Sequence, residues 1–432
     1  MSLARLTQSL KVPLEYQNPE LGVASVPLIK YPAAANATSP YQGILLINPG
    51  GPGASGIDMA LGYGPIFEEA MGGNWDVVGF DPRGMYESQP LVNCSATTTG
   101  QETRLDSRSV PRMPDDYYDS FIQFGINLGS DCATTSGGQL DAGPHMSTAT
   151  TARDMLSIVD AFAATEDGKR AAKPSHLLNY YGVSYGTFLG QTFASMFPER
   201  VGSMVLDGVV DPEAYLTNWT RNNVNHLDGG IAGFFIYCHE VGPSECSYYT
   251  GSSAKDIYER FVRSFTQLDA ETAIEQNWQN ATEIESAVLN LKVLLLATAY
   301  MPLVQYGNLA DSLLHLEIAI WGQILSEWNE ETIATYGVST PDGFTDAQFA
   351  LGVLCSDQGN IWFNKTLDDF RPLVAELDSQ SIAGDVWIKT IMACSGWSIK
   401  AAERFTGPFT GDTATPILFV GNTYDPVTPV DK

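Results

Sequence analysis

The sequence predicts an α/β protein in which a mostly parallel, doubly wound sheet is interrupted by a large helical cap before its last strand. Several short apolar runs have the length and composition of strands that are buried on both faces. Helix-like segments separate these runs, as the connections between parallel strands require. After residue 211, helical periodicity replaces this alternation for about 200 residues.

Composition limits the classes of partner. The 432 residues carry a formal net charge of −27 and are 44% hydrophobic, enough to bury a large core. The negative charge argues against nucleic acid or an anionic membrane as a partner. It would suit a cationic ligand such as a free amino terminus, but the simpler explanation is a soluble protein of an acidic or extracellular medium. The longest apolar stretch, residues 293–304, is too short to span a bilayer.

Residues 1–211 are predicted to form the first part of the sheet domain. Residues 12–31 have the pattern of opening strands, and the apolar run 43–48 predicts a buried strand. This run breaks into the loop 48–53, Asn-Pro-Gly-Gly-Pro-Gly, which lacks the spacing of nucleotide-binding loops. We expect that the bare backbone at Gly51 approaches a substrate carbonyl.

The next strand, 75–80, ends at Asp-Pro-Arg-Gly. Arg83 in this turn is either a substrate contact or, more commonly, a brace that donates hydrogen bonds to neighbouring loop carbonyls. Residues 94–145 are rich in Gly, Ser and Thr, and we expect surface loops there. Ser147 and the threonines after it offer N-caps for a helix that runs to Ala164.

Residues 182–186, Gly-Val-Ser-Tyr-Gly, lie between an apolar run and a helix-like segment. This context is typical of a nucleophile elbow, a sharp strand-to-helix turn that exposes a reactive serine. Ser184 is therefore the predicted nucleophile, and a structural turn serine is the alternative. The N–H of Tyr185, at the start of the helix, and that of Gly51 would stabilise an oxyanion.

Residues 212–410 are predicted to form the cap, with helices at 254–268, 283–300 and 309–328. Residues 411–432 return to the sheet, where an apolar strand ends in a turn with Asp425. Ligand sites of such sheets gather at this end of the strands, so Asp425 is the predicted catalytic acid. Its alternative role is to cap its own turn. Asp207 and Asp211 are the second choices.

A serine nucleophile needs a general base, usually a histidine that a carboxylate orients. After an elbow of this kind the chain order is Ser, acid, His. All five histidines precede Asp425, however: His145, His176, His226, His239 and His315. We expect the base to lie outside the 432 residues, on a continuation of this chain or on a second polypeptide, unless a cap histidine reaches the site.

The six cysteines contain no C-x-x-C pair and no cluster with zinc spacing, and they allow three disulfides in 15 connectivities. Five glycosylation sequons begin at Asn36, Asn93, Asn218, Asn280 and Asn364. Together these features favour a secreted glycoprotein, although no signal peptide is evident at the start. We predict no metal or other cofactor.

The motifs together resemble the tripeptidyl-aminopeptidase-like branch of the α/β-hydrolases, relatives of the prolyl iminopeptidases. The resemblance runs from about residue 12 to 432. The motifs that carry it are 12–16, 48–53, 81–84, 182–186, 206–212, 355–357, 394–397 and 425–429. It implies the α/β-hydrolase fold and a secreted serine hydrolase that removes short peptides from free amino termini. By motif position, Ser184 is the nucleophile, Asp425 the acid, and the N–H groups of Gly51 and Tyr185 the oxyanion hole.

An aminopeptidase also needs a carboxylate that pairs with the substrate's ammonium group. Asp357, Glu240 and Glu245 are candidates, and each also fits an ordinary surface or structural acid. The predicted function is thus a serine exopeptidase that acts on a peptide or a small ester or amide. One alternative is an esterase or acyl-transfer enzyme of small-molecule biosynthesis. The other is a non-catalytic binding protein on a hydrolase scaffold, which the missing histidine favours and the intact elbow opposes.

Overall fold

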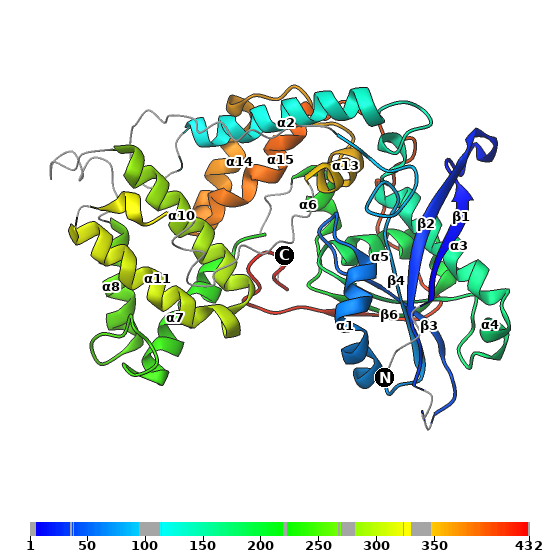
Figure 1. The fold of residues 1–432 in the computed structure, drawn as a ribbon, viewed down its shortest axis with the longest axis horizontal. Coiled ribbons are helices and arrows are strands. Elements are labelled where there is room, and N and C mark those ends of the chain that lie inside the picture. The colour runs from blue at the N-terminus through cyan, green and yellow to red at the C-terminus, as the bar shows by residue number, and fades with distance from the viewer. Residues whose placement is uncertain are drawn as a thin grey trace.

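The computed structural model describes residues 6–34, 37, 39–94, 113, 115–218, 223–266, 268, 281–322, 324–329 and 347–430. Figure 1 shows two parts, a sheet with its covering helices on the right and a group of cap helices on the left. Helix α2 (Asp115–Ser136) runs along the top from one part to the other. The C-terminal end of the described chain lies between the two parts.

The described strands form one sheet in the order β1-β2-β4-β3-β5-β6-β7. Their bounds are β1 Leu6–Pro13, β2 Val23–Tyr31, β3 Gly43–Asn48, β4 Trp75–Phe80, β5 Leu178–Val183, β6 Val201–Asp207 and β7 Ile417–Val420. The β1–β2 and β2–β4 pairs are antiparallel, and all pairs from β4 to β7 are parallel. The predicted mostly parallel, doubly wound sheet is confirmed, and its last described strand follows the cap.

Both faces of the central strands are covered, which explains their continuously apolar sequence. Along β3, Ile44 and Leu46 point into the main core, and Leu45 and Ile47 point into a second cluster on the other face. The main core includes side chains of α3 (Thr148–Ala163) and α5 (Tyr185–Met196). The second cluster packs against α1 (Gly56–Ala70).

The cap consists of helices joined by loops. Its helices are α6 Pro212–Thr217, α7 Leu227–Val241, α8 Ala254–Thr266, α10 Ala281–Tyr300, α11 Pro302–Gly322, α13 Ala347–Asp357, α14 Leu367–Gln380 and α15 Lys389–Ala393. The cap also contains the short helices η4 Leu325–Glu327, η5 Gly384–Ile388 and η6 Cys394–Gly396. Short helices outside the cap are α4 Glu166–Arg170, η1 Pro19–Leu21, η2 Gly143–His145 and η3 Pro198–Arg200. The helix predicted at 309–328 instead starts at Pro302, a residue favoured in the first turn, and ends at Gly322.

The prediction of surface loops over residues 94–145 is wrong for α2. Its many Gly, Ser and Asp residues are weak helix formers, so contacts with the cap have to stabilise it. A Cβ on Gly125 would lie 2.1 Å from the Ala393 oxygen, and one on Gly129 would lie 2.0 Å from the Gly396 oxygen. The two glycines thus let α2 pack directly on α15 and η6, and α2 joins the cap although it precedes the elbow.

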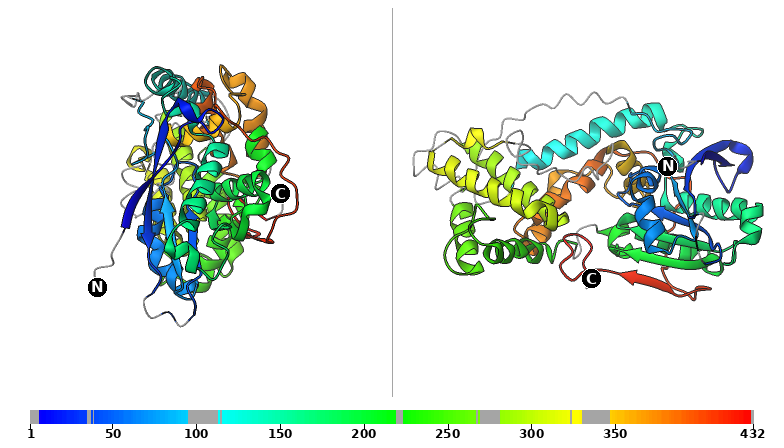
Figure 2. Two further views of the ribbon diagram at one scale, coloured as in Figure 1. Left: turned by 90° about the vertical axis from the view of Figure 1, so that its right-hand side faces the viewer. Right: turned by 60° about the horizontal axis from the view of Figure 1, so that its bottom comes forward.

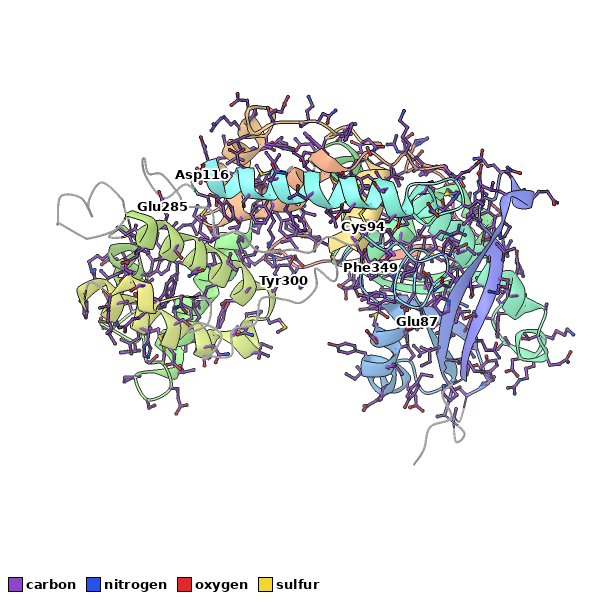
Figure 3. All side chains as sticks on the ribbon, turned by 45° about the horizontal axis from the view of Figure 1, so that its top comes forward. Glu87, Cys94, Asp116, Glu285, Tyr300 and Phe349 are labelled. Atoms are coloured by element: carbon purple, nitrogen blue, oxygen red, sulfur yellow. A yellow bond between two sulfur atoms is a disulfide. The ribbon has the colours of Figure 1, made fainter. Side chains whose placement is uncertain are left out.

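Three disulfides settle the cysteine pairing that the sequence left open: Cys94–Cys132, Cys238–Cys246 and Cys355–Cys394. The first disulfide links Cys94, at the start of the 94–145 segment, to α2, and Figure 3 shows Cys94 below that helix. Among the described helices, none combines the length and the hydropathy that a membrane span needs.

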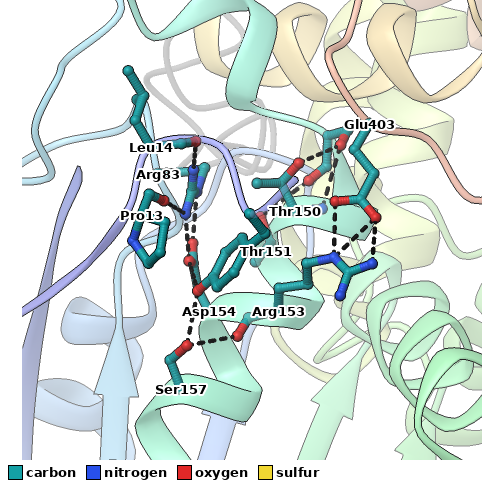
Figure 4. A network of polar contacts seen from close by, with 11 residues as sticks. Pro13, Leu14, Arg83, Thr150, Thr151, Arg153, Asp154, Ser157 and Glu403 are labelled. Atoms are coloured by element: carbon teal, nitrogen blue, oxygen red, sulfur yellow. Dashed lines mark hydrogen bonds and ion pairs between the residues drawn. The ribbon is translucent and has the colours of Figure 1, made fainter. Parts of the chain in front are cut away.

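Arg83 is a brace, as the commoner of its two expected roles requires. Its side chain is only 2% exposed. Its Nε donates to Asp154 Oδ2 at 2.7 Å and its Nη1 donates to the Leu14 carbonyl at 2.7 Å. Nη2 donates to the Pro13 carbonyl at 3.2 Å (Figure 4). The arginine therefore ties the end of β1 to α3 and is not available to a substrate.

Candidate active site

Ser184 lies at the turn between β5 and α5. Its backbone has φ 55° and ψ −123°, a conformation that costs energy for any residue except glycine. Hydrogen bonds hold it there: the Ser184 N–H donates to the Asp207 carbonyl at 3.0 Å, and Thr187 Oγ1 donates to the Ser184 carbonyl at 2.7 Å. The structure thus gives the serine the backbone that a nucleophile elbow needs.

The two elbow glycines are required by space. A Cβ on Gly182 would lie 2.4 Å from the Gly186 oxygen. A Cβ on Gly186 would lie 2.8 Å from the Asn48 oxygen, so this glycine lets the 48–53 loop approach the start of α5. The Gly-x-Ser-x-Gly spacing therefore follows from close packing of strand, helix and loop.

Gly50 brings the 48–53 loop against the elbow. It has φ +99°, and a Cβ there would lie 2.5 Å from the Val183 oxygen and 3.0 Å from the Tyr185 nitrogen. In the described part of the chain, no protein acceptor is hydrogen-bonded to the N–H of the next residue, Gly51. The sequence pointed to Gly51, but it did not show that Gly50 makes the contact; the doubled glycine was the available signal.

Asp425 lies in the turn after β7. Its Oδ1 accepts from the Thr428 N–H at 2.8 Å, from Thr428 Oγ1 at 2.9 Å and from the Val427 N–H at 3.1 Å. No described donor is hydrogen-bonded to Oδ2, which can therefore orient a base. The carboxylate both caps its own turn and presents its second oxygen, so the two roles that the sequence left open are compatible.

The acid turn and the elbow meet at Gly208. A Cβ on this glycine would lie 3.2 Å from Thr428 Oγ1 and 3.8 Å from the Ser184 nitrogen. The Gly208 N–H also donates to the Val420 carbonyl at 2.9 Å, which fixes the end of β7. In space, Gly208 therefore lies between Ser184 and the turn that carries Asp425. Sequence reasoning missed Thr428, although its Asp-Pro-x-Thr spacing was visible.

The two second-choice acids have other partners. The Asp207 carboxylate accepts from the Tyr181 hydroxyl at 2.6 Å. Asp211 is the N-cap of α6 and accepts from the Glu213 and Ala214 N–H groups at 2.9 and 3.2 Å. Both therefore serve as structural hydrogen-bond acceptors.

The cap packs on the acid turn. A Cβ on Gly229 of α7 would lie 2.2 Å from the ring of Tyr424, the neighbour of Asp425. Burial, with the nearby Asp425 charge, raises the pKa of Tyr300, so its hydroxyl stays protonated. Figure 3 shows Tyr300 at the end of α10 nearer the sheet domain and Glu285 at the far end. The acid turn therefore lies at the junction of sheet and cap.

Two of the five histidines lie away from this junction. His176 precedes β5, at the strand end opposite Ser184, and His145 is buried with its Nε2 bonded to the Gln139 carbonyl at 2.9 Å. His239 and His315 lie on α7 and α11. His226 contacts the acid turn, with its ring centroid 6.1 Å from that of Tyr424.

The three candidate acids for an ammonium group are not gathered at Ser184. Asp357 is 4% exposed, and its carboxylate accepts a hydrogen bond from the Thr148 N–H. Glu240 is exposed near the C-terminal end of α7, about 16 Å along the helix from Gly229. Glu245 is exposed beyond that end. Among the described residues, no group of three His, Cys, Asp or Glu side chains is placed to hold a metal ion.

Two family models match the chain: the α/β hydrolase fold over residues 43–244, and a TAP-like protein model over residues 379–432. The first includes the 48–53 loop and the elbow, and the second includes β7 and Asp425. The two matches therefore cover both of the segments that meet at Gly208.

Three curated relatives are similar to parts of the chain. Serine protease Hip1 of Mycobacterium tuberculosis is 36% identical over 213 residues, 48% of this chain and 36% of the relative. Tripeptidyl aminopeptidase of Streptomyces lividans is 30% identical over 238 residues, 52% and 39% of the two chains. Carboxylesterase B of M. tuberculosis is 34% identical over 272 residues, 61% and 47%.

The chain spans about a third to a half of the length of these relatives. The sheet topology, the elbow, the acid turn and the two family models agree with one another. The chain therefore belongs to the α/β-hydrolase superfamily, and its last part is similar to TAP-like proteins.

Proposed function

We propose that this chain is the catalytic part of a serine hydrolase that releases residues or short peptides from free amino termini. Ser184 Oγ attacks the acyl carbonyl while a histidine base takes its proton, and Asp425 orients that base. The N–H groups of Gly51 and Tyr185 stabilise the oxyanion. The base then protonates the leaving amine, and water hydrolyses the acyl-enzyme.

The observation that carries this proposal is the meeting of three segments at one point. Strained Ser184, the glycine loop at Gly50 and the Asp425 turn come from residues far apart in the chain. Contacts at Gly50 and Gly208 bring them together. A structural turn serine would need neither a bare backbone loop beside it nor an acid turn one residue away.

We place the base on polypeptide outside the 432 residues. The β7 edge of the sheet, visible beside β6 in the right-hand view of Figure 2, supports this placement. Leu418 and Phe419 on this strand are 58% and 52% exposed. Polypeptide paired with this edge would cover them and would bring a histidine close to Asp425. His226 is the alternative, and His226→Ala distinguishes the two: this account predicts that hydrolysis survives the substitution.

Peptidase activity is favoured over esterase activity by two relatives, whose printed names are a serine protease and a tripeptidyl aminopeptidase. The relative named carboxylesterase B supports an esterase as the second candidate. The three disulfides support a secreted or extracellular protein. Of the sequon asparagines, Asn93 and Asn364 are exposed, Asn218 is half-buried, and Asn36 and Asn280 lie outside the described residues.

The test measures hydrolysis of peptide p-nitroanilides with free and with acetylated amino termini, using Ser184→Ala as the control. We expect turnover that requires Ser184 and falls at least tenfold when the amino terminus is blocked. Equal rates on both substrates would contradict amino-terminal specificity. Activity on simple esters alone would favour the esterase. A folded protein without Ser184-dependent turnover of any substrate would support the non-catalytic binding protein.

A further inference from the structure

The Cys-Ser-Asp segment at the end of α13 has no part in the proposed chemistry, yet a disulfide and several hydrogen bonds hold it in place. Cys355 is in a disulfide with Cys394. The Gln358 side chain donates to the Tyr215 carbonyl at 2.7 Å, and Arg404 Nε and Nη2 donate to the Asp357 carbonyl at 2.9 and 2.7 Å. A disulfide and the hydrogen bonds to Tyr215 and Arg404 thus hold the segment in place, and its Asp357 side chain points into the sheet domain.

The Asp357 carboxylate binds the first turn of α3. The Thr148 N–H donates to Oδ1 at 2.8 Å, and Thr148 Oγ1 donates to Oδ2 at 2.5 Å. The Tyr215 hydroxyl donates to Oδ2 at 3.1 Å. An anion at a helix N-terminus is favourable, and these donors satisfy an ionised carboxylate.

Thr148 passes this contact on to the elbow, because its Oγ1 lies 2.5 Å from the Tyr185 hydroxyl oxygen. The single Thr148 proton is used on the carboxylate, so the Tyr185 hydroxyl donates to Thr148. Burial raises the pKa of Tyr185 and of Tyr215 far above the ordinary tyrosine value, so both hydroxyls remain protonated donors. Hydrogen bonds therefore run without a break from Asp357 to the residue that follows Ser184.

We propose that Asp357 is a positioning residue: through the hydroxyl groups of Thr148 and Tyr185, it fixes the residue whose N–H belongs to the oxyanion hole. The inference rests on the proposed hydrolase function. In this proposal the family-like Cys-Ser-Asp segment connects the cap to the elbow through these hydrogen bonds. The charged and titratable groups that interact with the carboxylate are Tyr185, Tyr215 and Arg404.

The energetic cost of burying the Asp357 carboxylate supports a positioning role. Burial raises the pKa of this carboxyl to about 6, so at neutral pH the folded protein holds a buried negative charge that burial disfavours. The carboxylate adds acceptors that fix the direction of each hydroxyl, and a displacement of about 1 Å in an active site can cost a hundredfold in rate.

The test compares Asp357→Asn, Thr148→Val and Tyr185→Phe in the natural protein, each of which breaks the chain at a different link. We expect kcat to fall tenfold to a hundredfold in each variant while KM stays within threefold. The double variant of Asp357 and Thr148 should be no slower than the slower single variant, since both act through one path. Losses that multiply, or a folded Asp357→Asn with kcat within twofold of wild type, would overturn the proposal.

One control keeps structural damage apart from positioning. Asp76→Asn removes a buried carboxylate at the far end of β4, where it accepts from the Ala33 N–H at 2.8 Å and the Tyr41 hydroxyl at 2.9 Å. This variant should keep kcat within threefold even if it lowers stability.

A second readout does not depend on turnover. Amide hydrogen exchange of a peptide spanning 183–190 should quicken at least fivefold in the three path variants and stay unchanged in the Asp76→Asn control. Exchange that is unchanged in Asp357→Asn would overturn the positioning role even if the protein is inactive on every substrate. If the wild type is inactive but exchange responds as stated, the proposed function fails and the positioning role stands.

Discussion

At the scale of single residues, the site depends on its glycines as much as on its reactive side chains. Ser184 has a strained backbone in a turn where a Cβ on Gly182 would collide with the Gly186 oxygen and one on Gly186 with the Asn48 oxygen. Gly50 and Gly208 likewise leave room for the loop and the acid turn. A sequence shows such glycines but not the atom that each of them makes room for, so their partners could be found only in three dimensions.

The first prediction concerns Gly50. In Gly50→Ala the new methyl group meets the Val183 oxygen at 2.5 Å on a backbone with φ +99°, so the loop must withdraw from Tyr185. We expect kcat to fall about a hundredfold or more, as for loss of an oxyanion donor. The control is Gly62→Ala on α1, where a Cβ has no neighbour within 4 Å. A Gly50→Ala variant as active as this control would contradict the placement of the loop.

The second prediction concerns the pH dependence of stability. The pKa of Asp357 rises from 3.8 to about 6 on folding, chiefly through burial, so the folded protein binds this proton more tightly than the unfolded chain does. The stabilisation by the protonated carboxyl is therefore complete below about pH 4 and is lost as the pH rises through about 6.

The measurement is urea unfolding of wild type and Asp357→Asn between pH 4 and 7.5. Relative to the variant, the unfolding free energy of the wild type should fall by about 2–3 kcal/mol over this range. Ionisable groups common to both proteins cancel in the difference. A difference that does not change with pH would show that the carboxyl titrates alike in the folded and unfolded states.

At the scale of elements, hydrophobic pattern predicted the strands and failed at α2. Strands β2, β3 and β4 were found at their expected residues, because short apolar runs between turn residues have few alternative structures. Residues 115–136 instead carry Gly, Ser and Asp among their apolar positions, and the helix depends on its contact with α15 and η6. Local propensity therefore pointed to a loop where tertiary packing makes a helix.

The third prediction follows from this packing. Gly125→Ala places a methyl group 2.1 Å from the Ala393 oxygen, a backbone atom that cannot turn aside. We expect a loss of about 2–3 kcal/mol in the unfolding free energy, from overpacking between α2 and α15. The matched control is Gly307→Ala in α11, where a Cβ has no neighbour within 4 Å and alanine favours the helix. Equal stability of the two variants would refute the contact.

At the scale of the whole molecule, the sequence predicted the order of sheet, cap and sheet, together with Ser184 and Asp425 at the ends of their strands. It left the disulfide pairing open, because six cysteines allow 15 connectivities. It also treated Asp357 as a candidate for the substrate's ammonium group, since a pattern cannot distinguish an acid that faces the substrate from one buried behind the elbow. The residues that join cap to sheet domain, Asp357 and Tyr424 among them, are separated from their partners by long stretches of chain.

The central claim is that Ser184 is an activated nucleophile. The most direct test is labelling of the natural protein, purified with any polypeptide bound to it, by a fluorophosphonate probe, with intact mass as the readout and Ser184→Ala as the control. We predict one adduct per molecule, absent from the control, because removal of the nucleophile leaves no activated hydroxyl. A folded protein that takes up no probe, or that is labelled equally in Ser184→Ala, would contradict the account.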